Sequence, residues 1–140
     1  MSISRLEVRI YYEDTDHGGV VYHANYLKFM ERGRTEFLRN LGFEQSILAA
    51  QEDVLFALTR SDVRYVLPAL FDDLLTVETC LMQAKGARIH FVQRILRPNS
   101  SSSPTLLVEA DIHLACMQKS GKAKRIPPFI LEKMRVEEFT

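Results

Sequence analysis

At 140 residues and 16.1 kDa, the chain is long enough for one domain with a single hydrophobic core and short for two. Its 18 basic residues balance 18 acidic ones, so no net charge attracts nucleic acid or an anionic membrane surface. We therefore expect one domain over residues 1–140 that binds no nucleic acid.

Three features lead us to expect a cytoplasmic protein. The first residues are polar and strand-like and lack the pattern of a secretory leader. No apolar run is long enough to cross a membrane. Cys80 and Cys116 lie in apolar strand patterns, which is typical of buried thiols in a reducing compartment.

Residues 3–12 alternate between apolar and polar side chains, which predicts a half-buried strand. The side chains expected to point inward are Leu6, Val8, Ile10 and Tyr12. From Ala24 to Leu41 the apolar residues recur at helical spacing, which predicts one long helix capped by Gly42. Gly33 predicts close backbone packing, because a mid-helix glycine otherwise costs roughly 1 kcal/mol relative to alanine.

The second half of the chain predicts strands. After a polar connection at 43–53 with a short helical turn, strand-like stretches follow near 54–66, 73–84, 88–97 and 106–118. The first of them changes parity, which predicts a bulge near Arg60–Ser61. Pro127 and Pro128 begin a short amphipathic helix, in which we expect Phe129, Leu131 and Met134 to point inward.

This order of elements predicts the fold class. One long helix after the first strand can bury its apolar stripe only against the concave face of a curved antiparallel sheet. We therefore expect an α+β fold, with a five-stranded curved antiparallel sheet wrapped around one long central helix and a short C-terminal helix. One helix cannot cover the whole sheet, so we also expect a dimer joined edge to edge, with the site at the seam.

The turn between the first strand and the long helix is crowded with titratable groups. It contains Glu13, Asp14, Asp16, His17 and His23, together with two glycines. Such crowding makes a strong default site, because packing alone does not explain it.

A metal site is the first possible interpretation of this turn. A calcium loop fails, because Gly18 and Asn25 stand where the loop needs oxygen ligands. A zinc site from Asp16, His17 and His23 stays open but matches no tight ligand spacing. We expect no metal.

Carboxylate chemistry at a helix N-terminus is the second possible interpretation of the turn. The sequence contains no Gly-x-Ser-x-Gly elbow and no glycine-rich nucleotide loop. Free N–H groups at the helix start stabilise a developing oxyanion, and a nearby aspartate can attack a carbonyl or activate water. That combination suits thioester hydrolysis. The alternative is that Asp14 and Asp16 only cap the turn and the helix, and local chemistry does not decide between the two.

The run Tyr12-Glu-Asp-Thr-Asp-His-Gly-Gly-Val-Val-Tyr-His-Ala-Asn-Tyr26, with Glu31-Arg32-Gly-Arg34 behind it, resembles the signature of the hotdog-fold acyl-CoA thioesterases. The similarity is to the 4-hydroxybenzoyl-CoA thioesterase family, in its Tol-Pal-associated (YbgC-type) branch, and covers nearly the whole chain. Relatives often have alanine in place of His17 and Gly33. The resemblance implies an acyl-CoA thioesterase without metal or organic cofactor, assembled as a homodimer or homotetramer.

By that resemblance, Asp16 is the catalytic carboxylate, either as nucleophile or as general base for water. His23 matches the family's second functional position, where its backbone N–H would polarise the thioester carbonyl. Tyr22 and Asn25 are supporting residues of the substrate site.

CoA is polyanionic, which suggests one further candidate binding surface. Lys122, Lys124 and Arg125 place positive charge on one turn, which either binds the phosphates of CoA or is simply solvated. Whether CoA or acyl-carrier protein is the carrier stays open. The resemblance also implies a link to phospholipid synthesis and the Tol-Pal envelope system.

Two rival functions stay open at this stage. One is a hydratase–dehydratase of enoyl thioesters on the same fold. The other is a non-catalytic subunit that binds acyl thioesters without turnover.

Overall fold

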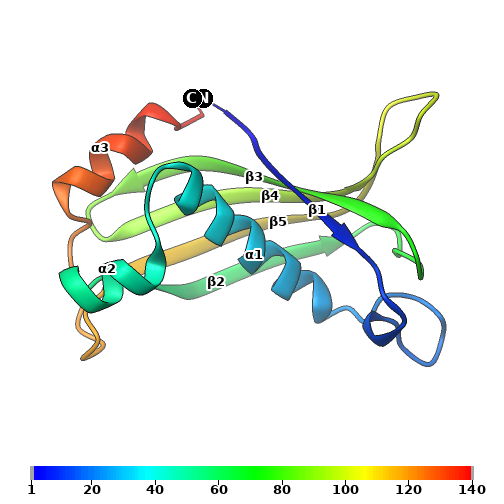
Figure 1. The fold of residues 1–140 in the computed structure, drawn as a ribbon, viewed down its shortest axis with the longest axis horizontal. Helices are drawn as coiled ribbons and strands as arrows, with labels where there is room; N and C mark the ends of the chain where they lie inside the picture. Colours follow the sequence, from blue (N-terminus) through cyan, green and yellow to red (C-terminus); the bar gives the residue numbers. More distant parts are fainter. Residues whose placement is uncertain (1, 140) are drawn as a thin grey trace.

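The computed structural model describes residues 2–139, and their elements follow the predicted order. The elements are β1 (Ser4–Arg9), the 3-10 turn η1 (Tyr12–Asp14), α1 (Asn25–Asn40), α2 (Gln45–Glu52), β2 (Leu55–Tyr65), β3 (Leu74–Lys85), β4 (Arg88–Arg97), β5 (Thr105–Met117) and α3 (Pro128–Val136). The strands form one antiparallel sheet in the order β1-β3-β4-β5-β2. Figure 1 shows α1 lying along the concave side of this curved sheet. The predicted α+β architecture is confirmed.

The core lies between α1 and the inner face of the sheet. Alternate residues of β3 and β5 are buried there, as their two-residue period predicts: Leu75, Val77, Thr79, Leu81, Val108, Ala110, Ile112, Leu114 and Cys116. From α1, Tyr26, Phe29, Met30 and Phe37 pack against them. Burial on this scale is the dominant favourable term for a domain of this size.

Gly33 explains how α1 comes so close to the sheet. A Cβ atom at this position would lie 2.8 Å from Thr79 Oγ1 and 3.0 Å from Val77 Cγ1, closer than side chains normally approach. The close packing predicted from the glycine is confirmed. The bulge in β2 is also confirmed, since its register against β5 shifts between Leu58 and Arg60.

Two predicted orientations were wrong. Tyr12 is 80% exposed, because β1 ends at Arg9 and the chain enters η1 instead of continuing as a strand. Phe129 is 44% exposed and Ile130 is buried in its place, together with Met134. Residues four positions apart share one face of a helix, so Ile130 and Met134 point inward together and Phe129 does not.

The sheet is unevenly covered by helices. Backbone contacts place α1 over β1 and β3, while β2 is the free edge at the other side of the sheet. As a result Leu58, near the start of β2, is 50% exposed. Within residues 2–139, no helix combines the length and apolar character that a bilayer crossing requires.

Candidate active site

The predicted site is built on a short hairpin, residues 14–22, here called the acidic hairpin. Thr15 bridges Val21, Asp16 N–H donates to Val20 C=O at 2.8 Å, and Tyr22 N–H donates to Asp14 C=O at 3.0 Å. The chain reverses at Gly19, whose φ of 84° favours glycine. The hairpin therefore holds Asp16 beside its tip and delivers the chain directly into α1.

The carboxylate of Asp16 has one anchored oxygen and one open oxygen. Its Oδ1 accepts hydrogen bonds from the backbone N–H of Gly18 at 2.8 Å and of Val20 at 3.4 Å. No group within residues 2–139 donates to Oδ2, and the side chain is exposed in the single chain. The anchored oxygen orients the group, and the open oxygen can attack a carbonyl or accept a proton.

The start of α1 offers free hydrogen-bond donors. The helix has no side-chain cap, because Ala24 occupies the N-cap position. Among the described residues, no acceptor is found for the backbone N–H groups of His23 or Ala24. Two N–H groups at the positive end of a helix dipole can bind the oxygen of a polarised carbonyl.

Asn25 and Asp14 hold the hairpin and the helix together. Asn25 Nδ2 donates to Asp14 C=O at 2.9 Å, so its amide is used inside the protein. Asp14 Oδ2 accepts from Tyr11 N–H at 2.8 Å and caps the turn η1. Tyr22 is about half exposed, with its ring 4.6 Å from that of His23.

An apolar pocket of about 240 Å³ lies beside the helix start, here called the His23 pocket. Its lining residues are Val21, His23, Tyr26, Tyr65, Val66, Leu67 and Pro68. Tyr65 donates its hydroxyl to His23 C=O at 3.5 Å, and its ring lies 6.2 Å from the imidazole. Sequence reasoning missed Tyr65 as a site residue, because it comes from the far end of β2, and only the sheet order brings it here.

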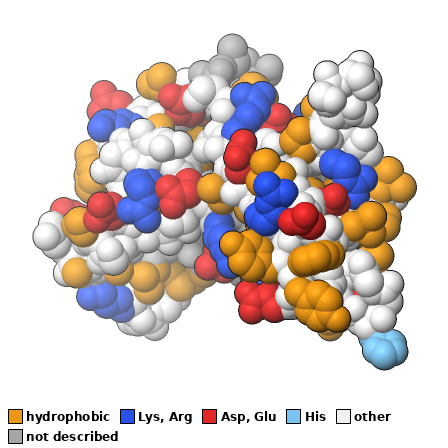
Figure 2. Space-filling view, turned by 45° about the vertical axis from the view of Figure 1, so that its right-hand side comes forward, with side chains coloured by type: hydrophobic (Ala, Val, Ile, Leu, Met, Phe, Trp, Pro, Cys, Tyr) orange, Lys and Arg blue, Asp and Glu red, His pale blue; other side chains and the backbone are white. Residues whose placement is uncertain are grey.

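Exposed apolar side chains surround this end of the molecule. Tyr11, Tyr12, Leu70 and Phe71 are 47–80% exposed, and the rings of Tyr12 and Phe71 lie 5.8 Å apart. Figure 2, turned toward this end, shows hydrophobic side chains gathered here.

The basic turn lies at the opposite end of the sheet from the acidic hairpin (Figure 1). Lys124 Nζ donates to Glu52 C=O at 2.5 Å, so its ammonium group helps to cap α2, whereas Lys122 and Arg125 are exposed. A single chain therefore does not bring the basic turn beside Asp16.

A wide pocket of about 660 Å³ lies near the basic turn and is lined in part by Arg60, Arg88, His90 and His113. The two imidazoles stack with centroids 4.4 Å apart, and His90 Nε2 lies 2.8 Å from Asp111 Oδ1. Within residues 2–139, no cluster of three His, Cys, Asp or Glu side chains is arranged to hold a metal ion.

Known proteins resemble this chain along almost its full length. Residues 10–134 match the family model of the thioesterase-like superfamily. The acyl-CoA thioesterase YbgC of Haemophilus influenzae is 45% identical over 119 residues, which cover 85% of this chain and 83% of that protein. The acyl-CoA thioester hydrolase YbgC of Escherichia coli is 41% identical over 138 residues, covering 99% and 96% respectively.

A solved structure agrees with these relatives. A probable thioesterase from Bartonella henselae is 37% identical and superposes with a TM-score of 0.83, over 90% of this chain and 100% of that one. The resemblance read from the acidic turn is thereby confirmed: the chain belongs to the thioesterase-like superfamily and has its hotdog fold.

Proposed function

We propose that this protein is an acyl-CoA thioesterase that hydrolyses acyl-CoA to a free carboxylic acid and CoA, with Asp16 as its catalytic carboxylate. The observation that carries the proposal is the Asp16 side chain, held by Gly18 N–H at 2.8 Å with its second oxygen open, on a hairpin that leads into an uncapped helix start. Relatives named as acyl-CoA thioesterases support the substrate class.

The chemistry follows from these groups. The thioester oxygen accepts from the N–H groups of His23 and Ala24, which stabilise the charge that develops on it. In the general-base route, Asp16 takes a proton from water, the hydroxide forms the new C–O bond, the C–S bond breaks, and the proton passes to the thiolate of CoA. In the nucleophilic route, Asp16 forms an anhydride as the thiolate leaves, and water then hydrolyses the anhydride. The geometry of one chain is compatible with both routes.

The site as proposed is completed in a dimer. β2 is an 11-residue edge strand, and its inner face is left uncovered by α1. An exposed edge of this length invites pairing, and a two-fold axis makes that pairing antiparallel and self-complementary. The start of β2 in one subunit then lies beside the end of β2 in the other, next to the His23 pocket.

Asp16→Asn tests the proposal. The amide keeps the size of the side chain and can still accept from Gly18 N–H, so the fold should survive. Loss of the carboxylate should lower kcat by on the order of a hundredfold or more, measured by thiol release from acyl-CoA. Asp14→Asn is the matched control and should keep most activity, because the Asp14 side chain only caps η1 and its C=O, which accepts from Asn25, is unchanged. A folded Asp16→Asn enzyme with the parent rate would refute the mechanism.

The same assay separates the rival functions. A hydratase or a non-catalytic binding subunit releases no thiol from a saturated acyl-CoA. Acyl-CoA and acyl-carrier protein loaded with the same acyl group, compared side by side, identify the carrier.

A further inference from the structure

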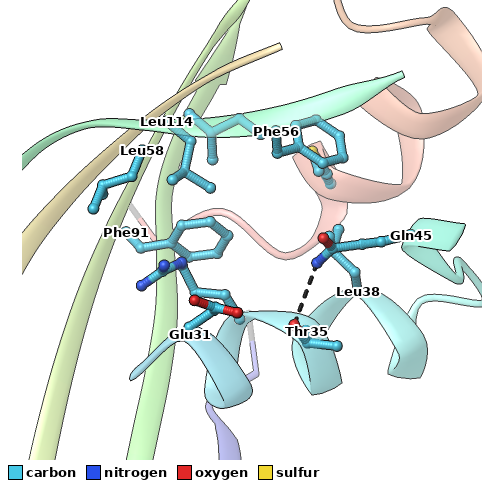
Figure 3. A pocket seen from close by; sticks show the side chains of 11 residues that line it. Glu31, Thr35, Leu38, Gln45, Phe56, Leu58, Phe91 and Leu114 are labelled. Atoms are coloured by element: carbon cyan, nitrogen blue, oxygen red, sulfur yellow. Dashed lines mark hydrogen bonds between the residues drawn. The ribbon is translucent and has the colours of Figure 1, made fainter. Parts of the chain in front are cut away.

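A third cavity, of about 270 Å³, lies between α1 and the inner face of the sheet near its β2 edge. We call it the Arg34 cavity. Figure 3 shows Glu31, Thr35 and Gln45 on its helical side, facing Phe56, Leu58, Phe91 and Leu114 on the sheet. The cavity therefore has one polar wall and one apolar wall, and ligand pockets commonly combine the two kinds of side chain.

Arg34 is held in this polar wall by a buried amide. Its Nη1 donates to Gln93 Oε1 at 2.9 Å. Gln93 is fully buried, and its Nε2 donates to Met30 C=O and to Thr79 Oγ1, both at 2.9 Å. Since both amide donors are occupied, the remaining oxygen of Gln93 can only accept, and it fixes the position of the guanidinium.

Within residues 2–139, the guanidinium forms no direct ion pair. Among the described residues, no carboxylate lies within 4.0 Å of Arg34, and its one hydrogen-bond partner is Gln93. Burial lowers the pKa of Arg34, while the charge of Glu31, one turn earlier on α1, acts in the opposite direction. A half-buried, pre-positioned guanidinium with unused N–H donors is suited to a carboxylate, which it can bind through two parallel hydrogen bonds.

The proposed dimer gives this cavity a place in the reaction. Phe56 and Leu58 lie near the start of β2, and Tyr65 ends the same strand. Antiparallel pairing of two β2 strands brings the start of one beside the end of the other. The Arg34 cavity of one subunit then adjoins the His23 pocket of the partner subunit.

We propose that the Arg34 cavity receives the far end of the acyl group whose thioester is cleaved in the adjoining subunit, and that Arg34 selects acyl groups that end in a carboxylate. This inference rests on the proposed thioesterase function and narrows its substrate class. The preferred substrates are thus CoA esters of dicarboxylic acids, with the apolar wall of the cavity packing against their methylene groups.

The test compares glutaryl-CoA with pentanoyl-CoA, which has the same chain length but no distal carboxylate. Dissociation constants are measured by calorimetry in the Asp16→Asn background, where turnover should be strongly slowed. We expect glutaryl-CoA to bind on the order of tenfold more tightly, the effect of one charge-assisted contact. Arg34→Gln should abolish that preference, and Arg34→Lys should keep part of it.

Glu31→Gln should change the preference for glutaryl-CoA in the opposite direction to Arg34→Gln. Its side chain is exposed, so the variant should fold, and removing the negative charge near Arg34 should increase the preference for glutaryl-CoA. Two results would overturn the inference and leave Arg34 a packing or interface residue. One is equal binding of the two esters by the Asp16→Asn protein, and the other is equal weakening of both when Arg34→Gln is added. Thiol release from pentanoyl-CoA by the parent enzyme tests the thioesterase function separately, so the two failures are distinguishable.

Discussion

At the scale of single residues, Tyr26 shows how a buried hydroxyl can support both the fold and the site. Its ring is buried in the core at the start of α1, and its hydroxyl accepts a hydrogen bond from Ala69 N–H at 3.0 Å. Ala69 is fully buried and follows the segment that lines the His23 pocket. The hydrogen bond thus ties the loop after β2 to the helix.

Tyr26→Phe should therefore lower the free energy of unfolding by about 1–2 kcal/mol, because it leaves the buried Ala69 N–H without an acceptor. Urea unfolding followed by circular dichroism measures the change. Tyr12→Phe is the control and should be neutral, since Tyr12 is 80% exposed. Equal stability of both variants would contradict the role given to this hydroxyl.

The same residue predicts a pH dependence. Burial raises the pKa of Tyr26, so the folded protein holds the phenolic proton more tightly than the unfolded chain does. Its contribution to stability is fully present below the unfolded pKa of about 10 and is lost as the pH rises through the higher folded value. Urea titrations across this alkaline range should show a loss of stability that is smaller in Tyr26→Phe.

At the scale of elements, the joint between the acidic hairpin and α1 decides the geometry of the site. Asn25 makes this joint through its hydrogen bond to Asp14 C=O at 2.9 Å. Asn25→Ala should lower kcat by roughly tenfold with only about 1 kcal/mol lost in stability, because misplacement of catalytic groups is costly. Asn40→Ala at the other end of α1, where the side chain makes one long exposed contact, should change neither quantity. Steady-state kinetics and urea unfolding of both variants decide the matter.

The basic turn before α3 is the second element with a testable role. Lys122 is exposed, and we predict that it meets the phosphates of CoA, whereas Lys124 is bound to the C-terminal end of α2. Lys122→Gln should raise KM for acyl-CoA and weaken its salt dependence at nearly constant kcat. Lys124→Gln should instead lower stability by about 1 kcal/mol, through loss of its contact with the helix carbonyls. An unchanged KM in Lys122→Gln would remove the turn from the substrate site.

At the scale of the whole molecule, the uncovered side of the sheet points to assembly. α1 covers β1 and β3, and the inner face of β2 stays half exposed. Sedimentation velocity should find a dimer or a dimer of dimers at micromolar concentration. On dilution, specific activity should fall together with the mass, because the proposed site is completed only in the dimer. A stable monomer with full activity would refute the dimer.

What the sequence determined by itself was the order of elements and the chemistry of one turn. Alternation along β3 and β5, the helical stripe of α1 and the glycine at position 33 are local patterns, and burial enforces each of them. The acidic turn identified the superfamily, because its residues are contiguous in the chain. The predicted orientations of Tyr12 and Phe129 were wrong. β1 ends before Tyr12, and α3 buries Ile130 in place of Phe129.

The tertiary structure alone decided which distant residues meet. Tyr65 contacts His23 across 42 positions of the chain, and Gln93 holds Arg34 across 59. Lys124 caps α2 through Glu52, which lies 72 positions earlier. These contacts depend on the sheet order β1-β3-β4-β5-β2 and on where α1 crosses it. Hydrophobic periodicity specifies only the face of an element that is buried. It does not specify which neighbour that face meets, so the composition of the pockets could emerge only from the folded chain.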